Sequence, residues 1–403
     1  MPQLSYLEDC GFLLLKSQNL IVFTNMDNIP LFKIYWDKKD TKAVNQVIES
    51  GRDWAIGAKI EEFETKLAKY VGAKYAVAFN SGTSGLHALL IAAGITEGDE
   101  VIVPSFTFIA TANACLMVGA KPVFAEIENE TYGLSPADVE KKITPKTKAI
   151  MVVHYGGLGC NIEEIKKIAD KHHLLLLEDA AESLGAKVNG KNVGTFGLAS
   201  MFSFCGPKVI TTGEGGMIAT DSKDIADKLK LLRSHGRAEV ANYFSSSEYM
   251  DYVQLGYNFR MSNITAALGV SQLEKIGKII SLRQKNANYL AKKLAGVKQI
   301  MLPATPKGFT HIYQMFTIYI EGGSKVRDGL QSHLNKKGIG AKVYFYPIHL
   351  TSFYRNDYGY KKGDLPQTEK ISDSVLTLPL YPGLTKKEMD YMAKEVIEFF
   401  KTA

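Results

Sequence analysis

From residue 38 to about residue 276 the chain alternates short apolar runs with longer amphipathic segments. The apolar runs YAVAF, EVIVP, KPVFAEI and LLLLEDA contain few polar residues, which is typical of strands that are buried on both faces. The intervening segments, such as EEFETKLAKYVG and IEEIKKIADKHH, carry apolar residues at helical spacing. This alternation predicts a mostly parallel sheet with helices on both of its faces.

Capping residues predict where several of these helices begin and end. The segment KKDTKAVNQVIESG is expected to be a helix with Asp40 or Thr41 as its N-cap and Gly51 as its stop. The next helix should end at Gly72, and a later one should begin after Ser135.

After residue 276 the pattern changes. A long helical stretch, IISLRQKNANYLAKKLAGV, is followed by the apolar runs MFTIYI and KVYFYP and by the closing helix KKEMDYMAKEVIEFFK. A chain of 403 residues is too long for one ordinary core. We therefore predict a large α/β domain over residues 26–276 and a smaller α+β domain over residues 277–403.

Residues 1–25 do not share the alternation and are predicted to be an N-terminal extension. Their apolar stretch GFLLLKSQNLIVF is short, is broken by Lys16 and has no basic flank, so we expect neither a signal peptide nor a membrane span. One interpretation is that the natural chain starts at Met26. The other is a genuine extension that packs on the surface.

Composition narrows the class of protein. Hydrophobic residues make up 46% and charged residues 22% of the chain, as in soluble globular proteins. The net charge of +6 is spread along the chain, and no basic run with interleaved aromatics suggests a nucleic acid partner. The four cysteines form no CxxC pair and the eight histidines have no metal-ligand spacing, so we expect reduced thiols in a cytoplasmic protein without a metal.

The candidate chemistry lies in the stretch from Leu174 to Gly216. Its first apolar run ends in Glu178 and Asp179, and about thirty residues later Lys208 follows the apolar run MFSF and a short turn. An acid at one strand end and a lysine beyond another suit pyridoxal 5'-phosphate (PLP). The lysine can form an imine with the cofactor aldehyde, while the acid keeps the pyridine nitrogen protonated. In isolation, such an aspartate is more often a helix cap and such a lysine a surface residue.

The segments EDAAESLGA, FSFCGPK and ITTGEGG resemble the DegT/StrS-type sugar aminotransferases, and the resemblance extends over roughly residues 30–400. These proteins are fold-type-I PLP-dependent transferases. The resemblance implies that Lys208 is the imine-forming lysine and that Asp179 is the partner of the pyridine nitrogen. It also implies a homodimer with shared active sites.

Further positions are assigned by the same resemblance. The implied cofactor contacts are Thr83, Ser84 and Ser203 at the phosphate, Phe108 on the ring face, Glu182 near the phenolic oxygen, and Asn258 reaching the phosphate from the second subunit. His349, in FYPIHL, falls near the sugar site, although a structural histidine is an equal alternative. Without the resemblance, Phe108 would be taken as a core residue and the NSGTSG turn of Thr83 as an ordinary turn.

The implied reaction is transfer of an amino group from L-glutamate to a keto group of a nucleotide-linked 6-deoxy sugar. The SFCGPKVITTGEGG segment most resembles family members that act at C4, perosamine synthases among them, with C3 as the near alternative. A related dehydratase branch replaces the lysine by histidine, and Lys208 argues against it. A non-catalytic PLP-binding regulator is the alternative of another class. Such proteins usually carry a DNA-binding unit, for which residues 1–29 are too short and unpatterned.

Overall fold

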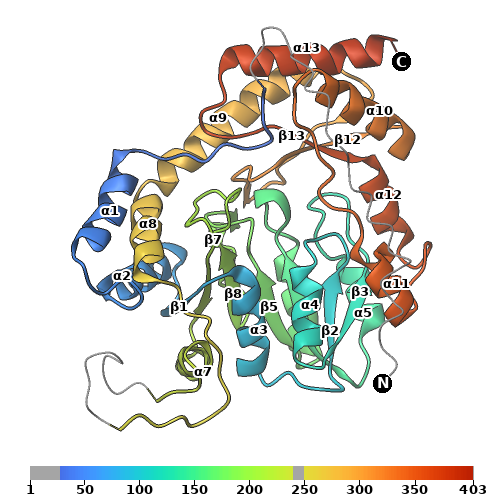
Figure 1. Ribbon diagram of the computed structural model, residues 1–403. Coiled ribbons are helices and arrows are strands. Elements are labelled where there is room, and N and C mark those ends of the chain that lie inside the picture. The colour runs from blue at the N-terminus through green and yellow to red at the C-terminus, as the bar shows by residue number, and fades with distance from the viewer. Residues whose placement is uncertain (1–27, 239–248, 403) are drawn as a thin grey trace, which may run out of the picture.

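The computed structural model of the protein describes residues 28–238 and 249–402 (Figure 1). The predicted extension, residues 1–25, lies outside these ranges. So does most of the polar segment between Arg237 and Tyr252, for which the sequence predicts a loop at the substrate site or between subunits. Both predictions therefore stay as they are.

A seven-stranded sheet forms the centre of the large domain (Figure 1). Within the described residues β9 alone runs antiparallel to the others, so the predicted mostly parallel sheet is confirmed. In spatial order its strands are β1 (Tyr75–Phe79), β9 (Gly216–Thr220), β8 (Ala199–Ser203), β5 (Leu175–Asp179), β4 (Thr147–Val153), β2 (Glu100–Pro104) and β3 (Lys121–Ala125).

Helices cover both faces of this sheet, because successive side chains of a strand point to opposite sides. In β2, Val101 and Val103 belong to one apolar cluster and Ile102 to the other. The first cluster is shared with α3 (Gly82–Ala92), α4 (Ala110–Met117) and α7 (Lys223–Arg233). The second is shared with α2 (Ala58–Val71), α5 (Pro136–Lys142), α6 (Ile162–Lys171) and α8 (Asn263–Glu274).

The helix ends agree with the capping residues except at the first helix. There α1 (Lys38–Glu49) takes Asp37 as its N-cap, and Asp37 and Asp40 form a reciprocal capping box. The prediction of Asp40 or Thr41 as the cap was therefore wrong by three or four residues, because Asp40 occupies the third helical position. The predicted end of α2 at Gly72 is confirmed, and Gly72 has the left-handed φ of 86° that favours glycine. Ser135 is the N-cap of α5, as predicted.

The smaller domain has an antiparallel sheet of β10 (Ile300–Met301), β12 (Phe316–Ile320) and β13 (Val375–Leu378). Around it pack α9 (Ile276–Leu294), α10 (Gly323–Lys336), α12 (Pro366–Ser374) and α13 (Lys386–Thr402). The remaining regular elements are α11 (Ser352–Tyr358), the 3-10 turns η1 (Tyr155–Gly157) and η2 (Ile348–Leu350), and a small sheet of β11 (Phe309–Thr310), β6 (Lys187–Val188) and β7 (Lys191–Asn192).

Two features of the small domain differ from the expectation. Ile29 lies in its core and pairs with Ile339, so the segment that follows Met26 packs on the small domain although the sequence grouped it with the large one. The run 342–347, KVYFYP, forms no regular strand, and only Lys342 pairs with a strand residue, Thr377. The domain limits themselves remain predictions.

None of the helices in the described ranges is long and apolar enough to cross a membrane.

Candidate active site

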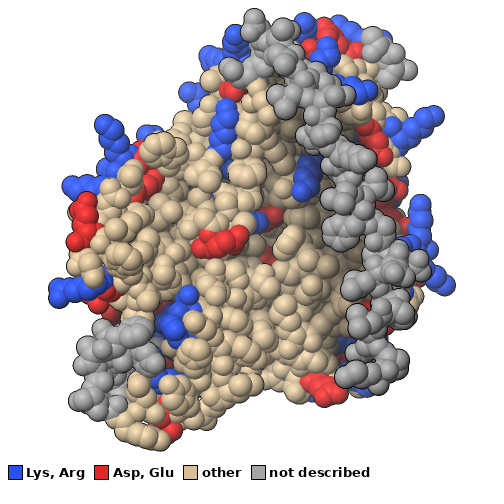
Figure 2. Space-filling view, viewed as in Figure 1, with Lys and Arg blue, Asp and Glu red and all other residues tan. Residues whose placement is uncertain are grey.

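A cavity of about 620 Å³ lies where the carboxyl ends of β4, β5 and β8 meet the small domain. Ligands of open α/β sheets bind at this edge. On the face seen in Figure 2 a few acidic and basic side chains lie near the centre of an otherwise uncharged area, while most charged side chains lie toward the rim. The large domain supplies the strand ends and the first turn of α3, and the small domain supplies residues 342–346, Thr377, Leu378 and Leu380.

Asp179, the last residue of β5, lines the cavity and is only 4% exposed. Its Oδ2 accepts a hydrogen bond from the Thr111 hydroxyl at 2.8 Å, and its Oδ1 accepts one from the backbone N–H of Ala181 at 3.1 Å. Burial raises the pKa of Asp179 above its ordinary value, and these two hydrogen bonds only partly oppose that effect. A cationic partner would therefore be strongly favoured beside this carboxylate.

Glu178 points away from the cavity and has a structural role. It accepts hydrogen bonds from His154 Nε2 at 2.9 Å and from three backbone N–H groups of the segment 194–197. Burial opposes its charge, but these donors together hold the pKa of Glu178 below its ordinary value. The adjacent acids Glu178 and Asp179 therefore have different roles, because side chains alternate along a strand and these two point to opposite faces of the sheet.

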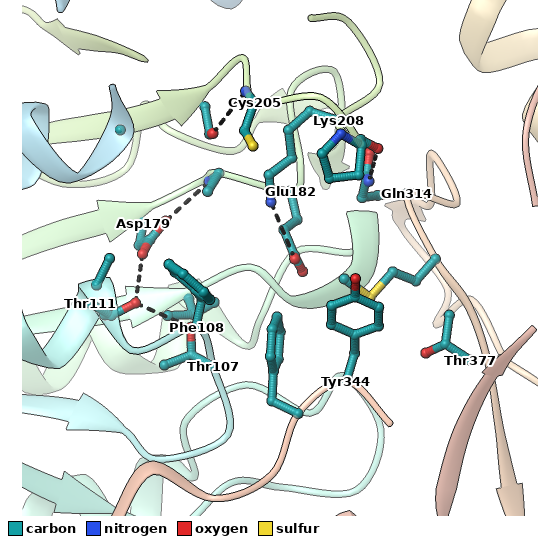
Figure 3. A pocket seen from close by; sticks show the side chains of 18 of the residues that line it. Thr107, Phe108, Thr111, Asp179, Glu182, Cys205, Lys208, Gln314, Tyr344 and Thr377 are labelled. Carbon is teal, nitrogen blue, oxygen red and sulfur yellow. Dashed lines mark hydrogen bonds and ion pairs between the residues drawn. The ribbon is translucent and has the colours of Figure 1, made fainter. Parts of the chain in front are cut away.

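Lys208 follows β8 by a short turn, in which its N–H binds the carbonyl of Cys205 at 3.1 Å. Its ammonium lies 3.4 Å from Glu182 Oε1 (Figure 3), and the other oxygen of Glu182 accepts the N–H of Gly156 at 2.9 Å. Lys208 and Glu182 both line the cavity that contains Asp179. The lysine and the acid that the sequence singled out are therefore brought to one site.

The first turn of α3 forms another part of the cavity wall through Ser81, Gly82 and Thr83. Ser81 caps the helix by accepting the N–H of Ser84 at 3.1 Å. The remaining first-turn N–H groups have no acceptor within the helix and suit an anion. A Cβ at Gly216 would stand 2.5 Å from the carbonyl of Ser81, so only glycine lets β9 approach this turn so closely.

Of the two serines that the resemblance assigned to the phosphate, Ser203 lines the cavity and Ser84 does not. Ser203, at the end of β8, lines the cavity beside this turn. Ser84 does not line it, because its hydroxyl lies 2.8 Å from that of Ser81 as part of the helix cap.

Phe108 stands on the loop between β2 and α4, is 61% exposed and lines the cavity (Figure 3). A phenylalanine this exposed is not a core residue, so the alternative of a buried ring is excluded. The adjacent Thr107 lies 3.1 Å from the hydroxyl of Thr111, so the loop that carries Phe108 is connected to Asp179. A flat ligand between Phe108 and the strand ends would meet an apolar face.

His349 requires a correction. It does not line the cavity, and its side chain is fully buried. Its Nδ1 lies 2.8 Å from Ser105 Oγ and its Nε2 lies 3.1 Å from Glu369 Oε1. Because both ring nitrogens have partners inside the protein, the structure favours the structural histidine over a sugar contact. His349 joins the small domain to Ser105, which follows β2 directly and precedes the loop of Phe108.

Asn258 is exposed and does not line the cavity of its own chain. Its backbone pairs with Ser234, and its carbonyl accepts the Asn80 side chain at 3.4 Å. The side chain is therefore available to another molecule, and its contact across a dimer stays a prediction.

Several cavity residues were missed by sequence reasoning: Thr111, Lys342, Tyr344 and Gln314. Gln314 is 7% exposed and donates from Nε2 to the carbonyl of Pro207 at 2.7 Å, which ties the small domain to the residue before Lys208. No local motif marks these positions. The run of residues 342–346 has an unusual composition, with three aromatic residues, but this pattern was interpreted as a strand.

The residues present fit PLP. The buried carboxylate of Asp179 suits the protonated pyridine nitrogen, and Lys208 in the same cavity suits the aldehyde. The exposed face of Phe108 suits the ring, and the N-terminus of α3 suits the phosphate. Within the described residues no cluster of side chains could hold a metal ion.

The chain is similar to several known proteins. GDP-perosamine synthase of Vibrio cholerae is 38% identical over 92% of this chain and 99% of that protein. The structure resembles that of Helicobacter pylori PseC, an aminotransferase of pseudoaminic acid biosynthesis, with a TM-score of 0.88 and 30% identity over 94% of this chain and all of that one. It also resembles Spr1654 of Streptococcus pneumoniae in its PLP form, with a TM-score of 0.88 and 26% identity over 93% and 99% of the two chains.

The family model of the DegT/DnrJ/EryC1/StrS aminotransferases matches residues 35–397. The fold-type-I architecture and the cofactor that the sequence motifs implied are thereby confirmed. The chain belongs to the DegT/DnrJ/EryC1/StrS aminotransferase family and is a PLP-dependent aminotransferase.

Proposed function

We propose that this enzyme transfers the amino group of L-glutamate to the C4 keto group of a nucleotide-linked 6-deoxy sugar. The observation that carries the proposal is the meeting of Lys208, Glu182 and buried Asp179 in one cavity. The choice of sugar and carbon is supported by the relative named GDP-perosamine synthase, which matches nearly its whole length, and by the motif around Lys208. Amination at C3 is the alternative, since the cavity lining alone does not distinguish the two carbons.

In this proposal the cavity residues divide the work between them. PLP supplies an electron sink for the carbon from which a proton is removed. Lys208 would anchor the cofactor, and its side-chain amine, when free, would move the proton that leaves the substrate carbon. Asp179 keeps the pyridine nitrogen protonated, and its two hydrogen bonds fix the carboxylate in one orientation. Glu182 holds the ammonium of Lys208 over the cavity, while Gly156 fixes Glu182 itself.

The proposal includes a homodimer in which Asn258 completes the phosphate site of the partner subunit. The exposed side chain of Asn258 and its absence from the cavity of its own chain support this arrangement. A cytoplasmic location also belongs to the proposal, because the described cysteines Cys115, Cys160 and Cys205 are free thiols.

The test is a substrate panel. The purified PLP-loaded enzyme is incubated with L-glutamate and GDP-, UDP- or dTDP-linked keto sugars, and each product is identified by mass. Nuclear magnetic resonance of the purified product assigns the aminated carbon. We expect one 4-keto sugar to be converted. Conversion of a 3-keto sugar alone would support the C3 alternative, and conversion of none would contradict the proposed substrate class.

A further inference from the structure

Lys342 is a cation on the cavity wall that the roles proposed for the site leave unused. Two lysines line the cavity, and Lys208 is paired with Glu182. Lys342 forms no ion pair with any residue in the described part of the chain. Its ammonium stands 4.9 Å from the centre of the Tyr344 ring, a cation–π contact that leaves its hydrogen-bonding protons available.

The backbone around Lys342 fixes the direction of its side chain. The N–H and carbonyl of Lys342 both bond to Thr377, at 3.1 and 2.9 Å, so the segment is held in extended pairing against β13. Ala341 and Val343 on either side are buried in the small-domain core. Because side chains alternate along an extended segment, Lys342 must point the opposite way, and it is exposed at the cavity.

Tyr344 connects this lysine to the reacting end of the site. Tyr344, Glu182 and Lys208 line the same cavity, and in Figure 3 the hydroxyl of Tyr344 points to the side on which Glu182 and Lys208 lie. Burial and, after it, the nearby carboxylate of Glu182 raise the pKa of Tyr344. The carbonyl of Tyr344 accepts the hydroxyl of Tyr155, which keeps the backbone in place. Lys342 thus lies over the ring of a tyrosine whose hydroxyl faces the Lys208–Glu182 pair.

The other charges of the cavity lining suggest a role for Lys342 in binding anions. Its acidic lining residues are Asp179, Glu182 and Glu214, and once Lys208 is committed to the cofactor, Lys342 is the remaining lining cation of the described residues. Both substrates of the proposed reaction are anions, since the donor carries carboxylates and the sugar carries a diphosphate. We propose that Lys342 is an oxyanion anchor that binds a donor carboxylate in one half of the reaction and the diphosphate of the sugar nucleotide in the other. This inference rests on the proposed function.

The choice of lysine suits such a shared role. A lysine ammonium is a compact charge on a flexible stem with three rotatable donors, so it can follow oxyanions of different shape, and an arginine fork can also bind both carboxylates and phosphates. One mobile cation can therefore serve a carboxylate and a phosphate that occupy the site in turn. The competing explanation is a solvated lysine whose only contact is the Tyr344 ring.

Calorimetric binding to the PLP-loaded protein separates these explanations. The ligands are GDP, UDP, dTDP and 2-oxoglutarate, with the uncharged nucleosides as references. The variants are Lys342→Met, Lys342→Arg and the control Lys325→Met, which changes an exposed lysine on α10 that does not line the cavity. We expect Lys342→Met to lower the affinity for the preferred nucleoside diphosphate and for 2-oxoglutarate about tenfold each, because one charge-assisted hydrogen bond is lost. Its nucleoside affinity, its thermal midpoint and all affinities of the control should stay unchanged, and Lys342→Arg should restore most of the loss.

Three results would overturn the inference. They are equal anion affinities in wild type and Lys342→Met, no anion binding in either protein, and a loss confined to one of the two anions, which would exclude a shared anchor. An equal loss of affinity for the uncharged nucleosides would indicate that the substitution disturbs the cavity wall, and this result would also contradict the inference. A failure of the proposed sugar chemistry is recognised separately, because it appears in the substrate panel and not in these titrations.

Discussion

The hydroxyl of Thr111 donates a 2.8 Å hydrogen bond to Asp179 Oδ2, and this contact joins the first turn of α4 to the end of β5. The same hydroxyl lies 3.1 Å from that of Thr107, next to Phe108. The carboxylate below the proposed ring and the aromatic face above it are therefore held by one short chain of hydroxyl groups.

Replacing Thr111 by valine should weaken cofactor binding. The variant keeps the shape of the side chain but removes a hydrogen bond to a charged group, which is worth about 1.5–3 kcal/mol. We expect PLP to dissociate roughly tenfold more easily, as measured by equilibrium dialysis with absorbance detection. Thr265→Val, at a helix start away from the cavity, is the matched control. An unchanged PLP affinity in Thr111→Val would show that Asp179 does not depend on this donor.

Asp179 should destabilise the cofactor-free protein at neutral pH. Burial raises its pKa in the folded state above the unfolded value of about 3.8, so its favourable contribution is complete below that value and is lost as the pH rises through the folded pKa. Asp179→Asn should therefore raise the thermal midpoint of the cofactor-free protein at pH 7 by about 2 °C or more. The difference should shrink as the pH falls toward 3.8 and vanish below it, while PLP binding is lost in the variant. A lower midpoint at pH 7 would contradict the assignment of a costly buried charge.

His349 should matter for stability and not for substrate affinity. His349→Ala removes the buried imidazole and its contacts with Ser105 and Glu369, and it leaves these two side chains with only the N–H groups of residue 349 and Gly363 as partners. The loss should cost roughly 2–4 kcal/mol of unfolding free energy. The measurements are urea unfolding and, at a permissive temperature, KM for the sugar nucleotide. The expected result is a lower unfolding midpoint with KM within about twofold of wild type. A raised KM with full stability would restore the sugar contact that the sequence suggested.

Mixing two inactive variants tests the shared active site. In a Lys208→Ala and Asn258→Ala hybrid dimer, one site carries both changes and the other carries neither. Random subunit exchange should therefore restore about a quarter of wild-type turnover. Native mass spectrometry verifies that the hybrids form. Hybrids without turnover would contradict the contribution of Asn258 across the dimer.

Local sequence patterns predicted the elements and the two central residues. Asp179 and Lys208 could be found because Asp179 ends one apolar strand and Lys208 lies one short turn after another, and parallel strand ends meet at one edge of the sheet. The family motif then added Phe108, Thr83 and Ser203, which line the same cavity.

The remaining site residues depend on contacts that no local pattern records. Thr111 binds an acid 68 positions away, and Gln314 binds a carbonyl 107 positions away. The sequence could not decide between a sugar contact and a structural role for His349, because its two partners, Ser105 and Glu369, come from distant segments that only the folded chain brings together. Lys342 looked like one residue of a strand, and its cavity exposure follows from pairing with β13.

The central claim is that Lys208 carries the chemistry at this cavity, and the visible absorption of the PLP-loaded protein on addition of L-glutamate tests it most directly. The account predicts that the wild-type band bleaches with release of one equivalent of 2-oxoglutarate per site. It also predicts that Lys208→Ala shows neither the change nor turnover. Normal turnover in Lys208→Ala, or a wild-type band that does not respond to any amino donor, would contradict it.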